Sequence, residues 1–438
     1  MTAREAALAV WRAALAAGDV APLVRSALQL RGSHLVAGSL DVDLDRARLL
    51  VLGCGKAGAS MARAVESVLG ERAGEGFVVV KDGYALPTAR IRIAEAGHPV
   101  PDTRGVAAST RLLELARGAR AGDLVLFLVS GGGSALTPAP APPVTLDEKQ
   151  ALTRLLLGAG ATIGELNAVR KHLSLFKGGQ LARAAAPAMV LTLALSDVIG
   201  DPLDVIASGP TAPDPTTFAD ALGVLAARGV APPEAVDRRL RAGARGEIEE
   251  TPKPGDPIFA RVTNQVIGNN ALITDAAVGT ARALGYEPTL LTRALQGEAR
   301  EVARDFVARA RTLQPPACLI AGGETTVTVT GQGRGGRCQE FALAAALELR
   351  EHDDIVVLAA GTDGTDGPTD AAGGIVDGGS RRRGEAAGID ARSALADNDG
   401  GTFLAKSGDR VVTGPTNTNL LDLYIAVRPA AHGTGEAL

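Results

Sequence analysis

Short apolar runs that end in loops of Gly, Ser, Thr and Asp recur along the 438-residue chain, and helical patterns alternate with them. Alternation of this kind is typical of α/β proteins with a largely parallel sheet. Ligands bind outside the carboxyl ends of the strands in such sheets, so loops at neighbouring strand ends are expected to share one crevice. The sequence therefore predicts an α/β fold and directs the search for function to its loops.

The apolar runs and the helical periodicity predict individual elements. Strands are expected at residues 47–52, 77–80, 124–129, 190–195, 265–267, 288–291, 317–321, 325–330, 355–360 and 424–427. Helices are expected at residues 57–69, 103–116, 146–157, 163–175, 271–283, 297–311 and 339–349. The proline-rich, charged segment 232–257 indicates a linker or surface excursion. We therefore expect two α/β domains, an N-terminal one over residues 1–240 and a C-terminal one over residues 258–438.

Charge and cysteine content narrow the classes of function. The net charge is −4 and no block of like charges occurs, which argues against a nucleic-acid partner or a polybasic membrane contact. The three cysteines form no CxxC pair, so a disulfide framework or structural zinc site is not expected. Charged residues at helical spacing interrupt the N-terminal apolar stretch, which predicts an amphipathic helix instead of a signal peptide. We expect a cytoplasmic protein without a membrane-spanning helix.

The first loop that can carry chemistry is GCGKAG, residues 53–58, between a predicted strand and a predicted helix. Its spacing matches G-x-G-x-x-G, so Gly53 and Gly55 are candidate nucleotide contacts. Lys56 places a cation inside the turn, where a nicotinamide cofactor has no need of it but a phosphoryl group in transfer gains from it. The structural alternative is a tight turn with a solvated lysine.

The second loop, SGGGS, follows the strand predicted at residues 124–129. Its main-chain N–H groups can turn inward as a nest for anions, and its two serines add hydroxyl donors. It matches neither a Walker A loop nor a GxSxG nucleophile turn, and a flexible hairpin is the structural alternative. The expected phosphate contacts are Ser130, Gly131, Gly132, Gly133 and Ser134.

Basic side chains gather at the end of the helix predicted at residues 163–175 and just beyond it: Arg170, Lys171, His172 and Lys177. Cations in the last turn of a helix can simply complement its dipole. They can also bind a carboxylate or phosphates. We expect Arg170 to contact the substrate and Lys177 to contact the nucleotide.

Two acidic segments, 194–204 and 361–370, each begin at the end of a predicted strand. Asp-Gly turns explain part of this composition. So many carboxylates would nevertheless repel one another without a cation, and Mg²⁺ takes one or two carboxylates together with substrate phosphates. The expected metal ligands are Asp197, Glu324, Asp363 and Asp366.

A glycine-rich stretch, residues 331–337, carries Arg334 and Arg337 immediately before a predicted helix. A guanidinium held over a transferring phosphoryl group stabilises its charge, as an arginine finger does. The structural alternative is a pair of surface charges on a mobile loop.

Eight motifs in order resemble those of the bacterial and archaeal D-glycerate 2-kinases, the two-domain family whose C-terminal part is called the MOFRL domain. The motifs cover residues from about 56 to 423 and are GCGKAG, EAGHPVPD, SGGGSAL, NAVRKHLSLFKGG, LSDVIGDPLDVIASGPT, GGETTVTVTGQGRGGRCQE, GTDGTDGPTDAAGG and TGPTNTNLLDL. An ordered set of this length is far more specific than any one motif.

The resemblance implies ATP- and Mg²⁺-dependent phosphorylation of D-glycerate at its 2-hydroxyl. It implies an N-terminal Rossmann-like domain, a smaller C-terminal α/β domain and an active site in the cleft between them. Lys56 falls on the catalytic lysine of the family and Arg337 on its GGR arginine, both of which are also expected to contact substrate. Asp197 falls on the aspartate of LSDVIGD. A homodimer is compatible with the sequence.

Departures from the family pattern bear on the acceptor more than on the reaction. Cys338 replaces the asparagine of GGRNQE, and Asn417 and Leu421 replace residues of TGPTGTNVNDL. Two other classes stay open. One is an NAD(P)H-dependent hydroxypyruvate reductase, which the glycine spacing and Asp82 support. The other is a non-catalytic ligand-binding protein that uses the same cleft.

Overall fold

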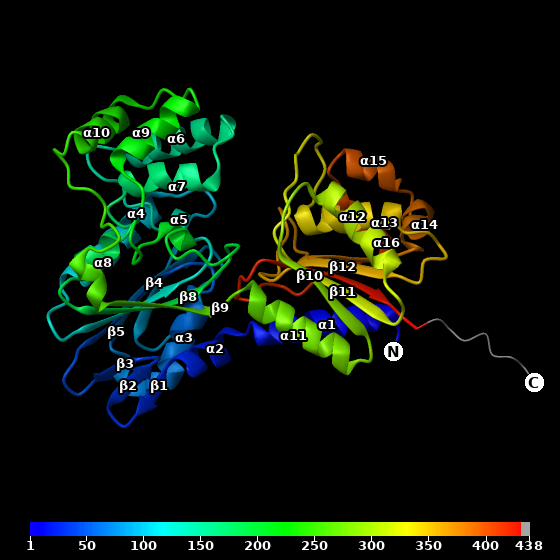
Figure 1. Cartoon of the computed structure of the whole chain (residues 1–438), viewed down its shortest axis with the longest axis horizontal. Coiled ribbons are helices and arrows are strands. Elements are labelled where there is room, and N and C mark those ends of the chain that lie inside the picture. The colour runs from blue at the N-terminus through cyan, green and yellow to red at the C-terminus, as the bar shows by residue number, and fades with distance from the viewer. Residues whose placement is uncertain (431–438) are drawn as a thin grey trace, which may run out of the picture. The chain divides into compact units, whose positions relative to one another are not determined.

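The chain forms two compact units in the computed structural model, which describes residues 1–430 (Figure 1). Unit 2 is Val20–Ile267, and unit 1 combines Met1–Asp19 with the chain from Gly268 onward. These units differ from the ranges expected from the sequence in two respects. The first helix belongs with the C-terminal part of the chain, and residues 241–267 belong with the N-terminal part.

Unit 2 is built on a six-stranded sheet with strand order β6-β5-β4-β7-β8-β9. Strands β4 to β8 pair in parallel, as expected for a Rossmann-like domain. All residues of β4 and β7 are buried, because a parallel sheet is covered on both faces and its central strands are continuously apolar. The strands are β4 (Leu49–Cys54), β5 (Glu75–Lys81), β6 (Ile91–Ala96), β7 (Leu124–Val129), β8 (Met189–Leu195) and β9 (Val262–Gly268).

Helices and a small antiparallel sheet complete unit 2. The helices are α2 (Val20–Ala27), α3 (Gly58–Leu69), α4 (Thr103–Arg117), α5 (Gly133–Leu136), α6 (Leu146–Gly158), α7 (Ile163–His172), α8 (Gln180–Ala185), α9 (Phe218–Ala227) and α10 (Glu234–Ala244). The 3₁₀ turns are η1 (Gly70–Ala73), η2 (Ile206–Ser208) and η3 (Pro257–Arg261). The small sheet is β1 (Gln29–Arg31), β2 (His34–Ala37) and β3 (Leu40–Asp43), which the sequence analysis missed.

The linker predicted at residues 232–257 is wrong over its first half, where α10 forms. Val236 and Leu240 lie four residues apart on one face of this helix and are buried in a cluster with α6, α7 and α9. The same cluster positions α6 and α7. Each of these two helices begins with a capping box, Thr145 with Glu148 and Thr162 with Glu165.

Unit 1 contains a mixed six-stranded sheet with order β10-β11-β15-β12-β13-β14. Only β10 and β11 pair in parallel among its described strands. The strands are β10 (Glu287–Leu295), β11 (Ala317–Gly323), β12 (Val356–Gly361), β13 (Gly373–Asp377), β14 (Arg410–Val411) and β15 (Asp422–Arg428). The helices are α1 (Ala3–Ala17), α11 (Asn270–Ala283), α12 (Ala299–Thr312), α13 (Arg337–Glu348), α14 (Ser380–Ala386), α15 (Ala391–Ala396) and α16 (Gly400–Ser407).

Helices cover both faces of this second sheet: α1 and α11 lie on one face, and α12 and α13 lie on the other (Figure 1). The strand predicted at residues 325–330 is wrong. That segment forms only an isolated bridge, between Glu298 and Thr326. The Thr-Val alternation suggested a half-buried strand, but Val329 is 73% exposed.

One segment of the described chain, Ala3–Ala27, has the length and mean hydropathy (1.4) of a membrane-crossing helix, a test that buried core helices also pass. The structure divides this segment into α1 and α2. Trp11 and four smaller residues of α1 are buried, and α1 packs against α11 and β15. This burial explains the apolar character of α1, which forms the amphipathic helix expected from the sequence.

Candidate functional site

The GCGKAG turn joins β4 to α3 and is held against the SGGGS loop. The main-chain N–H of Lys56 donates to the carbonyl of Gly131 at 2.9 Å, and that of Ala57 donates to the hydroxyl of Ser130 at 3.0 Å. Gly55 has φ of +127°, and a Cβ there would lie 2.3 Å from the Ser130 hydroxyl oxygen. The two loops that the sequence presents separately therefore form one surface.

Gly55→Ala is expected to destabilise unit 2 by about 2–5 kcal/mol, through a strained φ and a clash with Ser130. The measurement is the urea unfolding midpoint, with an unchanged slope as the sign of an intact two-state transition. Gly83→Ala is the matched control, because Gly83 also has positive φ (+81°) but open space around its Cβ position. Equal destabilisation by the two substitutions would contradict the tight contact with Ser130.

The SGGGS loop brings Lys56 and His98 together. A Cβ on Gly132, whose φ is +85°, would lie 3.0 Å from the His98 ring and 3.4 Å from Cγ of Lys56. Three of the other expected phosphate contacts, Ser130, Gly133 and Ser134, form hydrogen bonds within the protein. Ser130 accepts from Ala57, the N–H of Gly133 donates to the Ser130 carbonyl at 3.3 Å, and the Ser134 hydroxyl lies 2.9 Å from that of Ser208. Gly132 thus lies beside both the Lys56 side chain and the His98 ring.

Gly53 lies inside β4 and has a packing explanation. A Cβ at this position would lie 2.7 Å from the main-chain oxygen of Leu128 on β7. Its assignment as a nucleotide contact stays a prediction, whereas the need for glycine follows from the close approach of the two strands.

Lys177, expected at the nucleotide, is a buried lysine whose ammonium is used by the protein. It donates to the carbonyls of Ser134 at 2.7 Å and Thr137 at 3.0 Å, which lie in and just beyond α5. Burial lowers the pKa of Lys177 from 10.5 to about 7. These hydrogen bonds indicate that Lys177 positions the SGGGS loop. They give less support to the prediction that Lys177 contacts a nucleotide.

The lowered pKa of Lys177 predicts a pH dependence of stability. Between about pH 7 and pH 10.5 the unfolded chain binds a proton at this lysine that the folded chain has released, so the contribution of this lysine to stability rises with pH. The free energy of unfolding of the wild type should therefore increase relative to that of Lys177→Met as the pH is raised from 7 to 10. Urea unfolding at several pH values measures this difference, and a difference independent of pH would contradict the assignment.

The neighbouring basic residues of α7 belong to a buried structural network. Lys171 pairs with Asp204 at 3.0 Å and with Asp214 at 3.3 Å. His172 contacts the carbonyl of Ala168 through Nδ1 at 2.7 Å and the carboxylate of Glu250 through Nε2 at 3.1 Å. Lys171 therefore supplies a counter-charge to Asp204.

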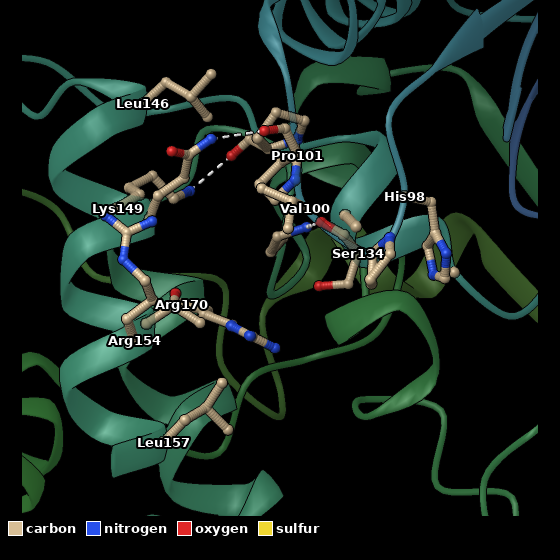
Figure 2. Close-up of a pocket in the computed structure, with 16 residues that line it drawn as sticks. His98, Val100, Pro101, Ser134, Leu146, Lys149, Arg154, Leu157 and Arg170 are labelled. Carbon is tan, nitrogen blue, oxygen red and sulfur yellow. Dashed lines mark hydrogen bonds between the residues drawn. The ribbon is translucent and has the colours of Figure 1, made fainter. Parts of the chain in front are cut away.

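Arg170, the remaining basic residue in the last turn of α7, lines a cavity of about 480 Å³ beside Gly132 and Ser134 (Figure 2). The cavity lies within unit 2, between α6 and α7 on one side and residues 98–101 and 132–138 on the other. No aspartate or glutamate is among the described residues that line it. Burial lowers the pKa of Arg170, as expected for a cation removed from water.

Arg337, at the start of α13 in unit 1, is held by a carboxylate fork. Its Nε and Nη2 donate to the two oxygens of Asp422 at 2.6 and 2.8 Å, and its Nη1 lies 3.0 Å from Glu324. Burial lowers the pKa of Arg337, but the Asp422 carboxylate more than offsets this and holds the pKa above its usual value. The hydroxyl of Tyr424 donates to Asp422 at 3.1 Å. The guanidinium is thus fixed in one orientation.

Asp422 is a site residue that the sequence analysis did not identify. It is fully buried at the start of β15, within the motif TGPTNTNLLDL. A carboxylate that opens the apolar run LYIAV is unusual in a strand, since a buried charge requires a partner. That feature was the available signal, but nothing in the local pattern indicates that the partner is Arg337.

Asp366, one of the expected metal ligands, caps α13. One oxygen accepts the N–H of Cys338 at 3.2 Å, and the other accepts the N–H and side-chain amide of Gln339 at 2.8 and 3.1 Å. Burial raises the pKa of Asp366 to about 6. Both oxygens are committed to holding the helix that carries Arg337, which argues against a role as metal ligand.

The other expected metal ligands are distributed over both units. Asp363 accepts from the N–H of Thr365 at 3.0 Å, Glu324 pairs with Arg337, and Asp197 follows β8 in unit 2. Within residues 1–430, no group of three or more His, Cys, Asp or Glu side chains is placed to hold a metal ion. A magnesium ion bound mainly through substrate phosphates needs no such group. The ligand assignments stay predictions.

The chain thus has two α/β units, one with a lysine in a glycine turn and the other with an arginine held by carboxylates. Separate family models match its parts: a domain of unknown function, DUF4147, over residues 6–241 and the MOFRL family over residues 317–422. The D-glycerate 2-kinase of Thermotoga maritima is 46% identical over 389 residues, covering 87% of this chain and 90% of that protein. Human glycerate kinase is 37% identical, and the match covers 97% of this chain and 93% of that protein. The chain belongs to the glycerate kinase family.

A solved structure shows the same fold. The crystal structure of glycerate kinase from Thermotoga maritima has a TM-score of 0.84 and 42% identity to this chain, and the match covers 97% of this chain and 99% of the other. The resemblance identified from eight sequence motifs is confirmed, as is the fold class of two α/β domains with a C-terminal MOFRL domain.

Proposed function

We propose that this chain is a kinase that transfers the γ-phosphoryl group of ATP to the 2-hydroxyl of D-glycerate. The hydroxyl oxygen forms a bond to the γ-phosphorus, the bond from that phosphorus to the β,γ-bridging oxygen breaks, and ADP and 2-phosphoglycerate result. The observation that carries the proposal is the position of Lys56 against Gly132, in a turn held by Ser130. Phosphoryl transfer requires mainly positioning and charge stabilisation, which this arrangement supplies.

The roles of the charged residues follow from this chemistry. Lys56 and Arg337 are the residues proposed to neutralise charge that develops on the phosphoryl oxygens. Asp197 orients the acceptor hydroxyl and receives its proton. Magnesium, when bound, would neutralise charge on the phosphate chain, and Asp363 is the carboxylate proposed to hold it. All three cysteines are buried free thiols, which suits a reducing cytoplasm, the proposed location of the protein.

The geometry disfavours the alternative of a nicotinamide-dependent reductase. In a dinucleotide site, the N–H groups that open the first helix bind pyrophosphate and the acidic residue after the second strand binds ribose. Here the N–H of Ala57 is taken by Ser130 and that of Gly58 by Gly55. Asp82 gives both carboxylate oxygens to Arg104, at 2.6 and 2.7 Å.

The experiment that tests the proposal is an assay of purified protein with D-glycerate, ATP and Mg²⁺, coupled through enolase. Enolase accepts the 2-phosphate and not the 3-phosphate, so a signal without added phosphoglycerate mutase establishes both the reaction and the position. A signal that appears only after mutase is added would move the product to the 3-hydroxyl. Consumption of NADH with hydroxypyruvate, without phosphoryl transfer, would overturn the kinase assignment.

A further inference from the structure

The cavity beside the SGGGS loop combines an apolar wall with cationic side chains (Figure 2). Val100 and Leu157 line it and are 61% and 55% exposed, although large apolar side chains are usually covered. Pro101, Pro138 and Leu146 extend the same wall. An apolar surface left open inside a concave site is suited to a flat, weakly polar group of a ligand.

Two guanidinium groups, from Arg154 on α6 and Arg170 on α7, also line this cavity. Within residues 1–430 neither makes a hydrogen bond or an ion pair with the protein. In Figure 2, Arg170 extends from α7 into the cavity, toward the side on which Ser134 and His98 lie. A cation with lowered pKa through burial, and with no carboxylate in the lining, leaves an anion as its natural partner.

The other long polar side chains of the lining are already used. Lys149 donates to the carbonyls of Pro138 and Leu173 at 2.6 and 2.9 Å, and Lys177 donates to those of Ser134 and Thr137. Gln150 donates to the carbonyl of Pro101 at 2.7 Å. These bonds make the wall rigid and leave the two guanidinium groups for the ligand.

The size of the cavity separates the two substrates of the proposed reaction. A three-carbon hydroxy acid is far smaller than about 480 Å³ and has no apolar face to place on Val100 and Leu157. A nucleotide has a weakly polar ring at one end and a polyanion at the other. The ring matches the apolar wall of the cavity, and the phosphates match Arg170. Guanidinium groups match phosphate geometry with paired hydrogen bonds.

We infer that this cavity of unit 2 binds the nucleoside triphosphate donor, with the base on Leu157 and Val100 and the phosphate chain at Arg170. The inference rests on the proposed function and locates the donor within it. Gly132 and Ser134 line the cavity, and the Gly132 Cβ position lies 3.4 Å from Cγ of Lys56, so the phosphate chain extends from Arg170 toward Lys56. Arg154, which is exposed on α6, adds a second positive charge at the rim.

Direct binding to the full chain tests the inference without turnover. Calorimetric titrations use ADP, adenosine, inorganic tripolyphosphate and D-glycerate. Arg170→Met should weaken the binding of ADP and of tripolyphosphate by about 10- to 100-fold and leave the binding of adenosine unchanged, because only the anionic ligands lose a charged hydrogen bond. Leu157→Ser should weaken ADP and adenosine alike, by about 5- to 10-fold, and leave tripolyphosphate unchanged.

Two substitutions control for changes unrelated to the cavity. Leu155→Ser alters an exposed leucine (49%) of the same helix that does not line the cavity, and Arg117→Met removes an exposed arginine at the end of α4. Both should bind all four ligands as the wild type does. Equal losses in the control and test variants would overturn the inference.

The outcomes distinguish this inference from the proposed function. If Arg170→Met and Leu157→Ser weaken the binding of D-glycerate but not that of ADP, the cavity binds the acceptor and the inference is wrong. If ADP binding depends on both residues but D-glycerate is not phosphorylated, the inference stands and the proposed function falls. If D-glycerate is phosphorylated while ADP binding is independent of both residues, the donor binds elsewhere.

Discussion

Lys56→Ala should lower kcat for D-glycerate phosphorylation by about 10²- to 10³-fold, the usual cost of removing one charged donor from a transition state. The substitution keeps the main-chain N–H groups of Lys56 and Ala57 and the hydroxyl of Ser130, which hold the turn. The unfolding midpoint should therefore stay near that of the wild type. Steady-state kinetics and urea unfolding of the same preparation measure both quantities.

Lys81→Ala is the matched control for Lys56→Ala. Lys81 ends β5, the strand beside β4, and its ammonium lies 5.2 Å from the centre of the Tyr84 ring. Removing this partly buried charge should leave kcat within about 2-fold of the wild type, since the proposed role belongs to the lysine inside the turn and not to a lysine on the neighbouring strand. A near-normal kcat for Lys56→Ala would remove Lys56 from the mechanism, and a large loss for Lys81→Ala would show that the effect is not specific to the turn.

Arg337→Met should abolish most activity and also destabilise unit 1 by about 3–5 kcal/mol, because it leaves the buried Asp422 carboxylate without its counter-charge. The stability loss alone could explain a loss of activity, so the single variant does not separate the two roles. Asp422→Asn supplies the second side of the comparison. It removes the charge that Arg337 neutralises and weakens the fork that orients the guanidinium.

The double variant Arg337→Met, Asp422→Asn separates structure from catalysis. The double variant has neither the arginine nor the buried charge, so most of the stability lost in Arg337→Met should return. The two substitutions together should therefore cost less than the sum of their separate costs. The kcat should stay low, since no guanidinium remains to stabilise the phosphoryl group. Urea unfolding of the complete cycle and the coupled assay measure the two quantities. Recovery of both stability and kcat in the double variant would show that Arg337 is only structural.

The sequence predicted strands β4, β5, β7, β8 and β9 of unit 2, four of its helices (α3, α4, α6 and α7) and the location of the loops that follow the strands. The strands expected at residues 124–129 and 190–195 match β7 and β8 within one residue, since each is a continuous apolar run bounded by polar residues. The site motifs could also be read from contiguous residues. The relatives and the solved structure confirm the family that the motifs identified.

Partners distant in sequence could not be predicted in this way. Ser130 supports a turn 73 residues earlier, and Asp422 holds an arginine 85 residues earlier, but each lies in a loop or strand whose local pattern is complete without that contact. The first helix packs in the C-terminal unit for the same reason: its amphipathic spacing specifies a buried face but not the surface that covers it. Helix α10 was not predicted in segment 232–257 because prolines flank it and its two large buried apolar residues are a weak helical signal.

The sequence by itself determined the α/β alternation, the glycine loops at the strand ends and the family, because short-range patterns of apolar and glycine residues encode them. The tertiary structure alone decided which of the charged residues are available to a ligand. Lys171, Lys177 and Asp366 are buried and held by partners within the fold, whereas Arg170 lines an open cavity. In sequence these residues look alike, since an isolated charge carries no record of its burial. Desolvation and hydrogen bonding give them different roles only after the chain has folded.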